Sequence, residues 1–226
     1  MFHDFLNFLY PRLCHTCEAA LLANENVVCT KCIHELPVTN YHLENENAVE
    51  KVFYGRVKIE NATSLLLFEK KGMVQQLIHN LKYKGHEEIG EFLGSWMGNE
   101  LKEIDRYKEI TAVVPVPLHK SRLRKRGYNQ VEKFGRAIAN SLEVPYIDNV
   151  LVKKSASTTQ TIKKRFARWG NIDATFMLEN HSLLEHSHVL LVDDLVTTGA
   201  TLEACATKLL KIPGVKVSLA TMAITH

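Results

Sequence analysis

Apolar residues along this chain follow two patterns, and the two patterns alternate. Continuous or alternating apolar stretches predict strands, which we place at Ile110–Val114, Tyr146–Val152, Val189–Val192 and Val215–Thr221. Apolar residues at helical spacing predict helices, which we place at Phe2–Leu9, Met73–Leu101, Val131–Ser141 and Ala204–Leu210. Helices between buried strands favour an α/β fold with a mostly parallel central sheet and right-handed crossovers.

Two features of the middle of the chain qualify this pattern. The segment Lys51–Lys70 alternates and then becomes apolar, with Asn61 near a turn position, so it predicts a strand pair or hairpin. Within the long helical stretch that follows, Gly90, Gly94 and Gly98 fall four residues apart. Because acidic residues surround them, these glycines indicate close helix packing, or a break between two helices, rather than a pair of membrane helices.

Length and composition limit what the chain can be. With 226 residues, 46% of them hydrophobic, it can form one core and a small appendage. Its net charge of +3 is small, so any contact with nucleic acid would depend on local basic patches. No apolar run is long enough to cross a bilayer, and Met1–Tyr10 lacks the basic start and apolar core of a signal peptide. We therefore expect a cytoplasmic protein.

Four of the five cysteines form two C-x-x-C pairs, which are Cys14 with Cys17 and Cys29 with Cys32. Each pair can place two thiolates on one cation, and the four together close a tetrahedral site. A reducing cytoplasm disfavours disulfides, and a redox C-x-x-C usually occurs singly, so the pattern predicts structural zinc. The fifth cysteine, Cys205, is predicted to be a buried core thiol.

A ribbon built on these cysteines is small enough to fold only with its metal. We therefore predict two units, a helix with a zinc ribbon over residues 1–45 and a larger domain over residues 46–226. The ribbon is a candidate platform for a protein partner.

The strand predicted at Val189–Val192 runs directly into two acids and a hydroxyl-rich turn. Backbone N–H groups at the start of the next helix, the hydroxyls and a glycine without a side chain favour a phosphate monoester there. Ionised aspartates only accept hydrogen bonds, so they would bind hydroxyl donors or a cation. A sugar phosphate with Mg²⁺ satisfies both halves, whereas the alternative is an ordinary turn capped by Asp and Thr. The candidate ligands are Asp193, Asp194, Thr197, Thr198, Gly199, Ala200 and Thr201.

A second candidate anion site follows the strand at Ile110–Val114. The prolines of Pro115-Val116-Pro117 fix the path of the loop. Beyond them, five cations within seven residues predict a mobile basic loop: Lys120, Arg122, Arg124, Lys125 and Arg126.

This loop could be merely solvated, close over a pyrophosphate or contact a nucleic-acid backbone, and the phosphate site nearby favours the second. Lys82 and Lys84, at the end of an earlier helical stretch, are further candidate anion ligands. Tyr128 could stack on a base.

These motifs resemble a known family. LLVDDLVTTGAT resembles the phosphoribosyl pyrophosphate (PRPP) signature of type I phosphoribosyltransferases. The four-cysteine ribbon, LKYKG, VPVPL, RKRGYNQ, Q-x7-R-x-x-N and VDDLVTTGAT occur in an order similar to that of the ComF/GntX family of phosphoribosyltransferase-like proteins, over nearly the whole chain. Lys163 departs from the pattern, which has an apolar residue there. The resemblance implies that Asp193 and Asp194 hold the ribose hydroxyls, that Thr197–Thr201 hold the 5-phosphate, and that Pro115–Pro117 form the pyrophosphate loop.

The resemblance also implies a type I phosphoribosyltransferase fold that binds PRPP with Mg²⁺. In a transferase, a nitrogen nucleophile would displace pyrophosphate while Mg²⁺ and cations neutralise the leaving group, which makes Asp193, Asp194 and Arg126 the catalytic candidates. The acceptor stays open between adenine, guanine, a pyrimidine and no base. An N-terminal cysteine performs glutamine hydrolysis in the related amidophosphoribosyltransferases; this chain begins Met1-Phe2, so we predict no such activity.

The ComF-like proteins are associated with DNA uptake in natural transformation. The competing hypothesis is therefore a non-catalytic module that binds single-stranded DNA and retains a PRPP pocket. Other DNA-uptake proteins are then candidate partners of the zinc ribbon.

Overall fold

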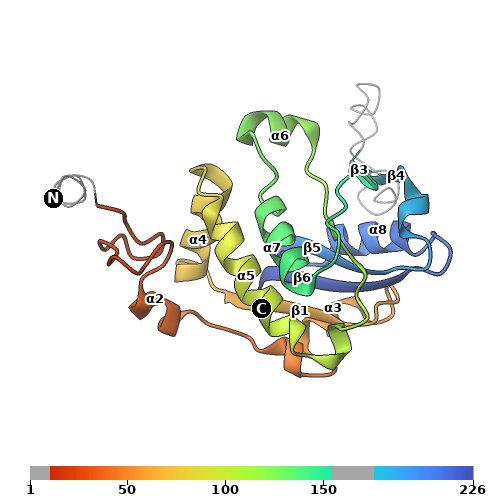
Figure 1. The fold of residues 1–226 in the computed structure, drawn as a ribbon, viewed down its shortest axis with the longest axis horizontal. Helices are drawn as coiled ribbons and strands as arrows, with labels where there is room; N and C mark the ends of the chain where they lie inside the picture. The colour runs from red at the N-terminus through yellow and green to blue at the C-terminus, as the bar shows by residue number, and fades with distance from the viewer. Residues whose placement is uncertain (1–10, 154–175, 226) are drawn as a thin grey trace, which may run out of the picture.

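The computed structural model describes residues 11–153 and 176–225, and its centre is a four-stranded sheet in the order β1-β6-β5-β2 (Figure 1). The three strand pairings in this sheet are parallel. The strands are β1 (Ala62–Phe68), β2 (Ala112–Pro115), β5 (His188–Val196) and β6 (Lys216–Thr225), while β3 (Leu151–Lys153) and β4 (Phe176–Leu178) form a separate antiparallel pair. The predicted α/β fold with a mostly parallel central sheet is confirmed.

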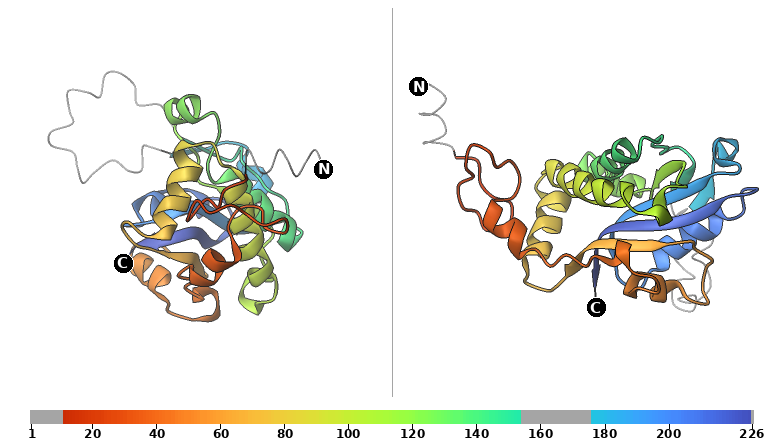
Figure 2. Two further views of the ribbon diagram at one scale, coloured as in Figure 1. Left: turned by 90° about the vertical axis from the view of Figure 1, so that its left-hand side faces the viewer. Right: turned by 60° about the horizontal axis from the view of Figure 1, so that its bottom comes forward.

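Helices connect the strands and cover both faces of the sheet (Figure 2). The α-helices are α2 (Thr30–Glu35), α3 (Ala48–Phe53), α4 (Met73–Tyr83), α5 (Glu88–Lys102), α6 (Lys120–Arg126), α7 (Glu132–Leu142) and α8 (Ala200–Leu209). Short 3₁₀ turns lie at Tyr41–Leu43, Asp105–Tyr107 and His181–Leu184.

The central strand β5 shows how the sequence pattern produces these two layers. Neighbouring side chains of a strand point to opposite faces. Leu190 and Val192 accordingly pack in one apolar cluster with α4, α5 and α7. Val189 and Leu191 pack in a second cluster with α3 and α8. The unbroken apolar run therefore reflects burial on both faces, as expected for a central parallel strand.

The glycine spacing marks close packing between α5 and α7. A Cβ atom added at Gly94 would lie 2.4 Å from the backbone oxygen of Phe134, and one added at Gly98 would lie 2.7 Å from the Cβ of Ser141. The chain also breaks between Tyr83 and Glu88, so the long helical stretch is two helices. Close packing at these glycines is confirmed, whereas a break at the glycines themselves is wrong, because α5 (Glu88–Lys102) runs through all three and the break lies before it.

The hairpin predicted over Lys51–Lys70 is wrong. Its first part is the end of α3, which begins because the Asn47 side chain accepts hydrogen bonds from the backbone N–H groups of Val49 (2.9 Å) and Glu50 (3.1 Å). Only β1 is a strand, and it pairs in parallel with β6 rather than with a local neighbour. The antiparallel contact on its other side comes from Val38, upstream of α3.

Two further predictions need correction. The strand expected over Tyr146–Val152 is interrupted, since Tyr146 makes only an isolated bridge to Val113 and the chain bends before β3. The loop expected over Lys120–Arg126 is helix α6. Arg, Lys and Leu are good helix formers, and Gly127 ends the helix in the left-handed region (φ +86°).

Two predicted features lie outside the described residues. They are the helix at Phe2–Leu9 and the Q-x7-R-x-x-N motif with Lys163. Within the part of the chain that the structure describes, no helix is both long and apolar enough to cross a membrane.

The cysteine-rich segment packs against the body of the molecule. Cys14, Val28, Cys32 and Leu36 share one apolar cluster with the residues of α4. Asn80 of α4 also donates a hydrogen bond to the backbone oxygen of His15 (2.8 Å). The predicted core thiol, Cys205, is buried on the other face of the sheet.

Candidate functional site

The two acids lie on β5 at the point where its neighbour β2 ends. Pro115 is the last residue of β2 and pairs with Val192, so Asp193 and Asp194 begin the carboxyl edge on that side. β5 itself continues to Val196. The two aspartates are therefore strand residues, and their side chains point to opposite faces of the sheet.

Asp194 faces the layer of α4 and α7, where it has two hydrogen-bond donors. The Lys82 ammonium of α4 lies 2.9 Å from Asp194 Oδ1. The Gln130 amide, just before α7, donates to Asp194 Oδ2 (2.6 Å). Because Asp194 is only 7% exposed, these two contacts offset the cost of burying its charge.

Asp193 faces the layer of α8 and is held differently. Its Oδ1 accepts a hydrogen bond from the Asp194 backbone N–H (2.8 Å). No lysine or arginine among the described residues forms an ion pair with it. Burial, followed by the negative charge of Asp194, raises the pKa of Asp193 to about 8. A cation or a hydroxyl donor placed beside Asp193 would favour its ionised form, which fits the chemistry of Mg²⁺ or of a sugar.

The hydroxyl-rich loop joins β5 to α8 and surrounds a small cavity. The cavity has a volume of about 40 Å³. Its lining includes Asp193, Thr197, Thr198, Gly199, Ala200 and Thr201. Gly199 precedes α8 with a φ of +72°, a conformation that glycine adopts without strain. The positive end of α8 therefore opens onto this cavity.

Helix α3 and the turn after it hold the loop from behind. A Cβ atom at Gly199 would lie 2.7 Å from Val52 Cγ1, so only glycine fits against α3. The Arg56 guanidinium donates to the backbone oxygens of Thr198 (2.7 Å) and Val52 (2.9 Å) and forms an ion pair with Glu203. Arg56 thus fixes the loop from a position 142 residues away in the sequence.

The proline turn runs alongside the acids. The Val116 backbone N–H donates to the oxygen of Val192 (2.9 Å), and the Asn129 amide donates to the oxygen of Val116 (3.2 Å). Pro115, Val116 and Pro117 therefore follow a fixed path from β2 past the acid pair toward α6.

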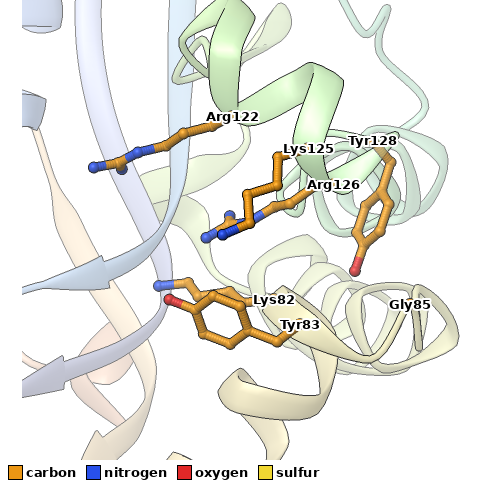
Figure 3. Close-up of a pocket in the computed structure, with 7 residues that line it drawn as sticks. All are labelled: Lys82, Tyr83, Gly85, Arg122, Lys125, Arg126 and Tyr128. Atoms are coloured by element: carbon orange, nitrogen blue, oxygen red, sulfur yellow. The ribbon is translucent and has the colours of Figure 1, made fainter.

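Beyond that turn, α6 and the end of α4 enclose a basic cavity of about 440 Å³ (Figure 3). We call it the basic cavity, and its lining residues are Lys82, Tyr83, Gly85, Arg122, Lys125, Arg126 and Tyr128. Figure 3 shows Lys125 and Arg126 projecting from α6 toward Lys82 and Tyr83, while Arg122 extends to one side of them. Four cations and two aromatic rings that face one opening can bind a phosphate-bearing ligand.

The two tyrosines of the basic cavity differ in availability. The Tyr83 ring is 67% exposed and lies under the guanidinium of Arg126, 5.3 Å from its Cζ. Tyr128 is partly buried, and its hydroxyl donates to the backbone oxygen of Leu81. Tyr83, rather than Tyr128, is therefore the more exposed ring of the basic cavity.

The structure brings some of the predicted cations to this site and leaves others outside it. Lys82, Arg122, Lys125 and Arg126 line the basic cavity. Lys84, Lys120 and Arg124 are exposed and are not among its lining residues.

Gln130 connects the acid pair to the basic cavity. Its amide nitrogen donates to Asp194, and its amide oxygen accepts from the Arg126 guanidinium (2.6 Å). The prediction missed Gln130 and Arg56 as site residues. The position of Gln130 just after the dense run of cations could have indicated that it belongs to the site. The sequence around Arg56 contains no such indication.

The four predicted metal ligands also come together. The Sγ atoms of Cys14, Cys17, Cys29 and Cys32 all lie within 4.8 Å of one another. Burial acts to raise the pKa of Cys14, but backbone N–H groups of Cys17, Cys29 and Thr16 lower it to about 6 overall. Four sulfur atoms this close together suit a thiophilic ion such as zinc.

Comparison with known proteins finds a matching domain family and several similar sequences. The phosphoribosyl transferase domain family matches residues 132–224. The chain is 28% identical to competence protein F of Haemophilus influenzae over 144 residues, which cover 62% of each protein. It is 26% identical to DNA utilization protein YhgH of Escherichia coli over 202 residues, covering 88% of this chain and 84% of that protein. It is 29% identical to competence protein ComFC of Streptococcus pneumoniae over 150 residues. The chain thus spans less than two thirds of competence protein F and of ComFC.

Two solved structures illustrate the likeness in three dimensions. Glutamine PRPP amidotransferase from B. subtilis matches with a TM-score of 0.37 and 17% identity, covering 58% of this chain and 26% of that one. Adenine phosphoribosyl transferase from Trypanosoma brucei matches with a TM-score of 0.38 and 16% identity, covering 80% of this chain and 81% of that one.

Proposed function

We propose that this chain, a phosphoribosyltransferase-domain protein of the ComF/GntX type, binds PRPP with Mg²⁺ at the carboxyl edge of its sheet. The observation that carries the proposal is that two different kinds of site flank the acid pair. A hydroxyl-lined loop at a helix start lies beside Asp193, and the basic cavity begins at Lys82 beside Asp194. One ligand that carries a phosphate, sugar hydroxyls and a pyrophosphate matches these parts in order.

In this proposal each part of PRPP has its own ligands. The 5-phosphate accepts hydrogen bonds from the loop of Thr197–Thr201 and faces the positive end of α8. The ribose hydroxyls donate to the aspartates, where Asp193 lacks a cation partner among the described residues. Mg²⁺ bound to the pyrophosphate would reduce its charge. The pyrophosphate extends toward Lys82 and Arg126.

Binding changes the contacts of Lys82. In the structure its ammonium is engaged with Asp194. When sugar hydroxyls donate to that carboxylate, the lysine becomes available to the pyrophosphate, which needs cations. Once released from Asp194, Lys82 helps to neutralise the pyrophosphate as it leaves. Preorganised positive charge contributes most to a phosphoribosyl transfer at that step.

The proposed reaction is a transfer to a nitrogen acceptor. The nitrogen lone pair forms a bond to the anomeric carbon as the bond from that carbon to the pyrophosphate oxygen breaks, and the nitrogen then loses a proton. Asp193 and Asp194 hold the sugar, while Arg126 faces the departing pyrophosphate. Covalent catalysis by a protein nucleophile has no part in this scheme.

Calorimetry with PRPP and Mg²⁺, followed by a pyrophosphate-release assay with a panel of nucleobases, tests the proposal. We expect Asp194→Asn to abolish binding or weaken it by more than tenfold, since the variant loses the charged acceptor. Asp105→Asn is the matched control, because Asp105 is an exposed acid paired with Lys108 on the 3₁₀ turn before β2. Equal PRPP binding by the wild type and Asp194→Asn would refute the proposed site, and binding without pyrophosphate release would refute the transfer.

A second candidate function is binding of single-stranded nucleic acid, favoured by the exposed ring of Tyr83 among cations. Aromatic stacking with a basic groove is the usual basis of binding without sequence preference. Two of the relatives named above are competence proteins and one is a DNA utilization protein. These names support a role of this chain in DNA uptake. DNA retention should weaken steeply with added salt and decline in Tyr83→Ala and Arg122→Ala. Retention that is absent or insensitive to salt would remove this function.

We also propose that the four cysteines hold structural zinc and that residues 1–45 form a ribbon distinct from the domain of residues 46–226. The convergence of four sulfur atoms supports this. The ribbon would serve as the platform for a protein partner in DNA uptake. Metal analysis that finds zinc lost in Cys17→Ser would support the assignment, while an undiminished zinc content would contradict it.

A further inference from the structure

A second group of metal-ligand side chains lies where the ribbon meets the body of the molecule. His15 comes from the first C-x-x-C turn, His86 from the connection between α4 and α5, and Glu88 from the first turn of α5. One nitrogen of each histidine and one carboxylate oxygen lie within 4.8 Å of one another. The four cysteines do not take part in this group.

Both histidines contact the same oxygen atom. His15 Nε2 and His86 Nδ1 each lie 2.9 Å from Glu88 Oε1. The two imidazole rings are close neighbours, with centroids 4.1 Å apart. A divalent cation at the point where the three atoms converge could be bound by all three side chains at once.

The backbone holds these three side chains in place from independent elements. The His15 N–H donates to the oxygen of Val27 (3.0 Å), and its own oxygen accepts from the buried Asn80 amide (2.8 Å). His86 and Glu88 lie in a turn that begins at Gly85, whose φ is +80°. In this turn the Glu87 backbone N–H donates a hydrogen bond to the Gly85 oxygen (3.0 Å). The backbone positions that bring the three side chains together therefore follow from the packing of the ribbon on α4.

We propose that His15, His86 and Glu88 bind a second divalent metal ion, of the zinc class, that fastens the ribbon to the junction of α4 and α5. Two imidazoles and one carboxylate are a donor set that zinc and other first-row transition metals accept. Three protein ligands leave one position open to water or to a group from a partner. His86 and Glu88 are exposed enough for the ion to enter from solvent, with 36% and 47% of their side chains accessible.

The proposal is independent of PRPP binding and is tested by counting metal on the full chain. The protein is saturated with Zn²⁺, freed of loosely bound metal by gel filtration and analysed by mass spectrometry for zinc per chain. We expect His86→Gln and Glu88→Gln each to hold one zinc fewer than the wild type. Both substitutions lie outside the ribbon, so the four-cysteine site stays intact. Glu87→Gln, one residue from Glu88 and outside the group, is the matched control and should retain the wild-type count.

Two readouts separate this site from the ribbon ion. Co²⁺ bound by thiolates gives strong charge-transfer absorption, whereas a site of two histidines and a glutamate adds only weak visible bands. The weak bands should appear in the wild type and be missing from Glu88→Gln. Thermal stability should rise with Zn²⁺ beyond the first equivalent in the wild type alone. Equal zinc content in the wild type, His86→Gln and Glu88→Gln would overturn the proposal.

Discussion

Substitution of Gly94 by alanine tests how tightly α5 must approach α7. Alanine ordinarily stabilises a helix interior relative to glycine by about 1 kcal/mol. At Gly94, however, the new Cβ would lie 2.4 Å from the Phe134 oxygen and 2.9 Å from the Cβ of Ala137. The nearest atom belongs to the backbone of α7 and cannot rotate away. The two helices must therefore separate by about 1 Å to reach an ordinary contact.

The cost of that separation exceeds the gain in helix propensity. Leu93, Met97, Phe134 and Ile138 are completely buried at or beside this interface, so a shift of α7 loosens well-packed side chains. Overpacking of this kind typically costs about 1–3 kcal/mol, and more where backbone must move. After subtraction of the helix-propensity gain, we expect Gly94→Ala to lower the free energy of unfolding by up to about 2 kcal/mol overall.

Gly90→Ala is the matched control one turn earlier on the same helix. Its new Cβ would lie 3.4 Å from the Cβ of Lys133 and from the Phe134 nitrogen, which are ordinary contacts. We expect this variant to stay within about 1 kcal/mol of the wild type. The free energy of unfolding of both variants is measured by urea denaturation, monitored by circular dichroism and tryptophan fluorescence. A Gly94→Ala variant as stable as Gly90→Ala would refute the inference that backbone contact sets the spacing of the two helices.

Three further predictions concern the loop, the metal and pH. Arg56→Ala should weaken PRPP binding about fivefold, because the Thr198 carbonyl loses a charged donor, whereas calorimetry should find Lys58→Ala unchanged. Removal of metal by a strong chelator, or by Cys17→Ser, should make residues 11–45 sensitive to protease while the parallel sheet persists. Burial lowers the pKa of His188, so the unfolded chain binds that proton more readily and the protein loses stability as pH falls below about 6.5. Urea titrations between pH 7 and 5 should show a smaller loss for His188→Gln, and equal losses would contradict the assignment.

Much of the fold could be predicted because the central strands are buried on both faces. That burial leaves a continuous apolar run, as in Val189–Val192, which is hard to mistake for a surface element. The segment Lys51–Lys70 was misinterpreted because half-apolar alternation there belongs to the short helix α3, which the Asn47 cap starts, and then to one strand. Only the distant strand β6 determines that β1 pairs in parallel.

For Asp193 and Asp194, the sequence motif identifies the residues but not the directions in which their side chains point. The sequence predicts that the strand ends at Val192, which would leave both aspartates in a loop. In the structure β5 continues to Val196, so strand alternation sends Asp193 toward α8 and Asp194 toward α4. The alternation of side chains along a strand could be applied to the sequence, but the residue at which β5 ends could not be predicted from it.

The link between the acid pair and the basic cavity depends on the side-chain amide of Gln130. Gln130 meets a carboxylate with its nitrogen and a guanidinium with its oxygen. A carboxylate at this position would repel Asp194, and a cation would repel Arg126. Only a neutral side chain with both a donor and an acceptor satisfies both neighbours at once. A ligand in the basic cavity that takes the Arg126 guanidinium away from Gln130 therefore removes one partner of Gln130, and the change reaches Asp194 through the same side chain.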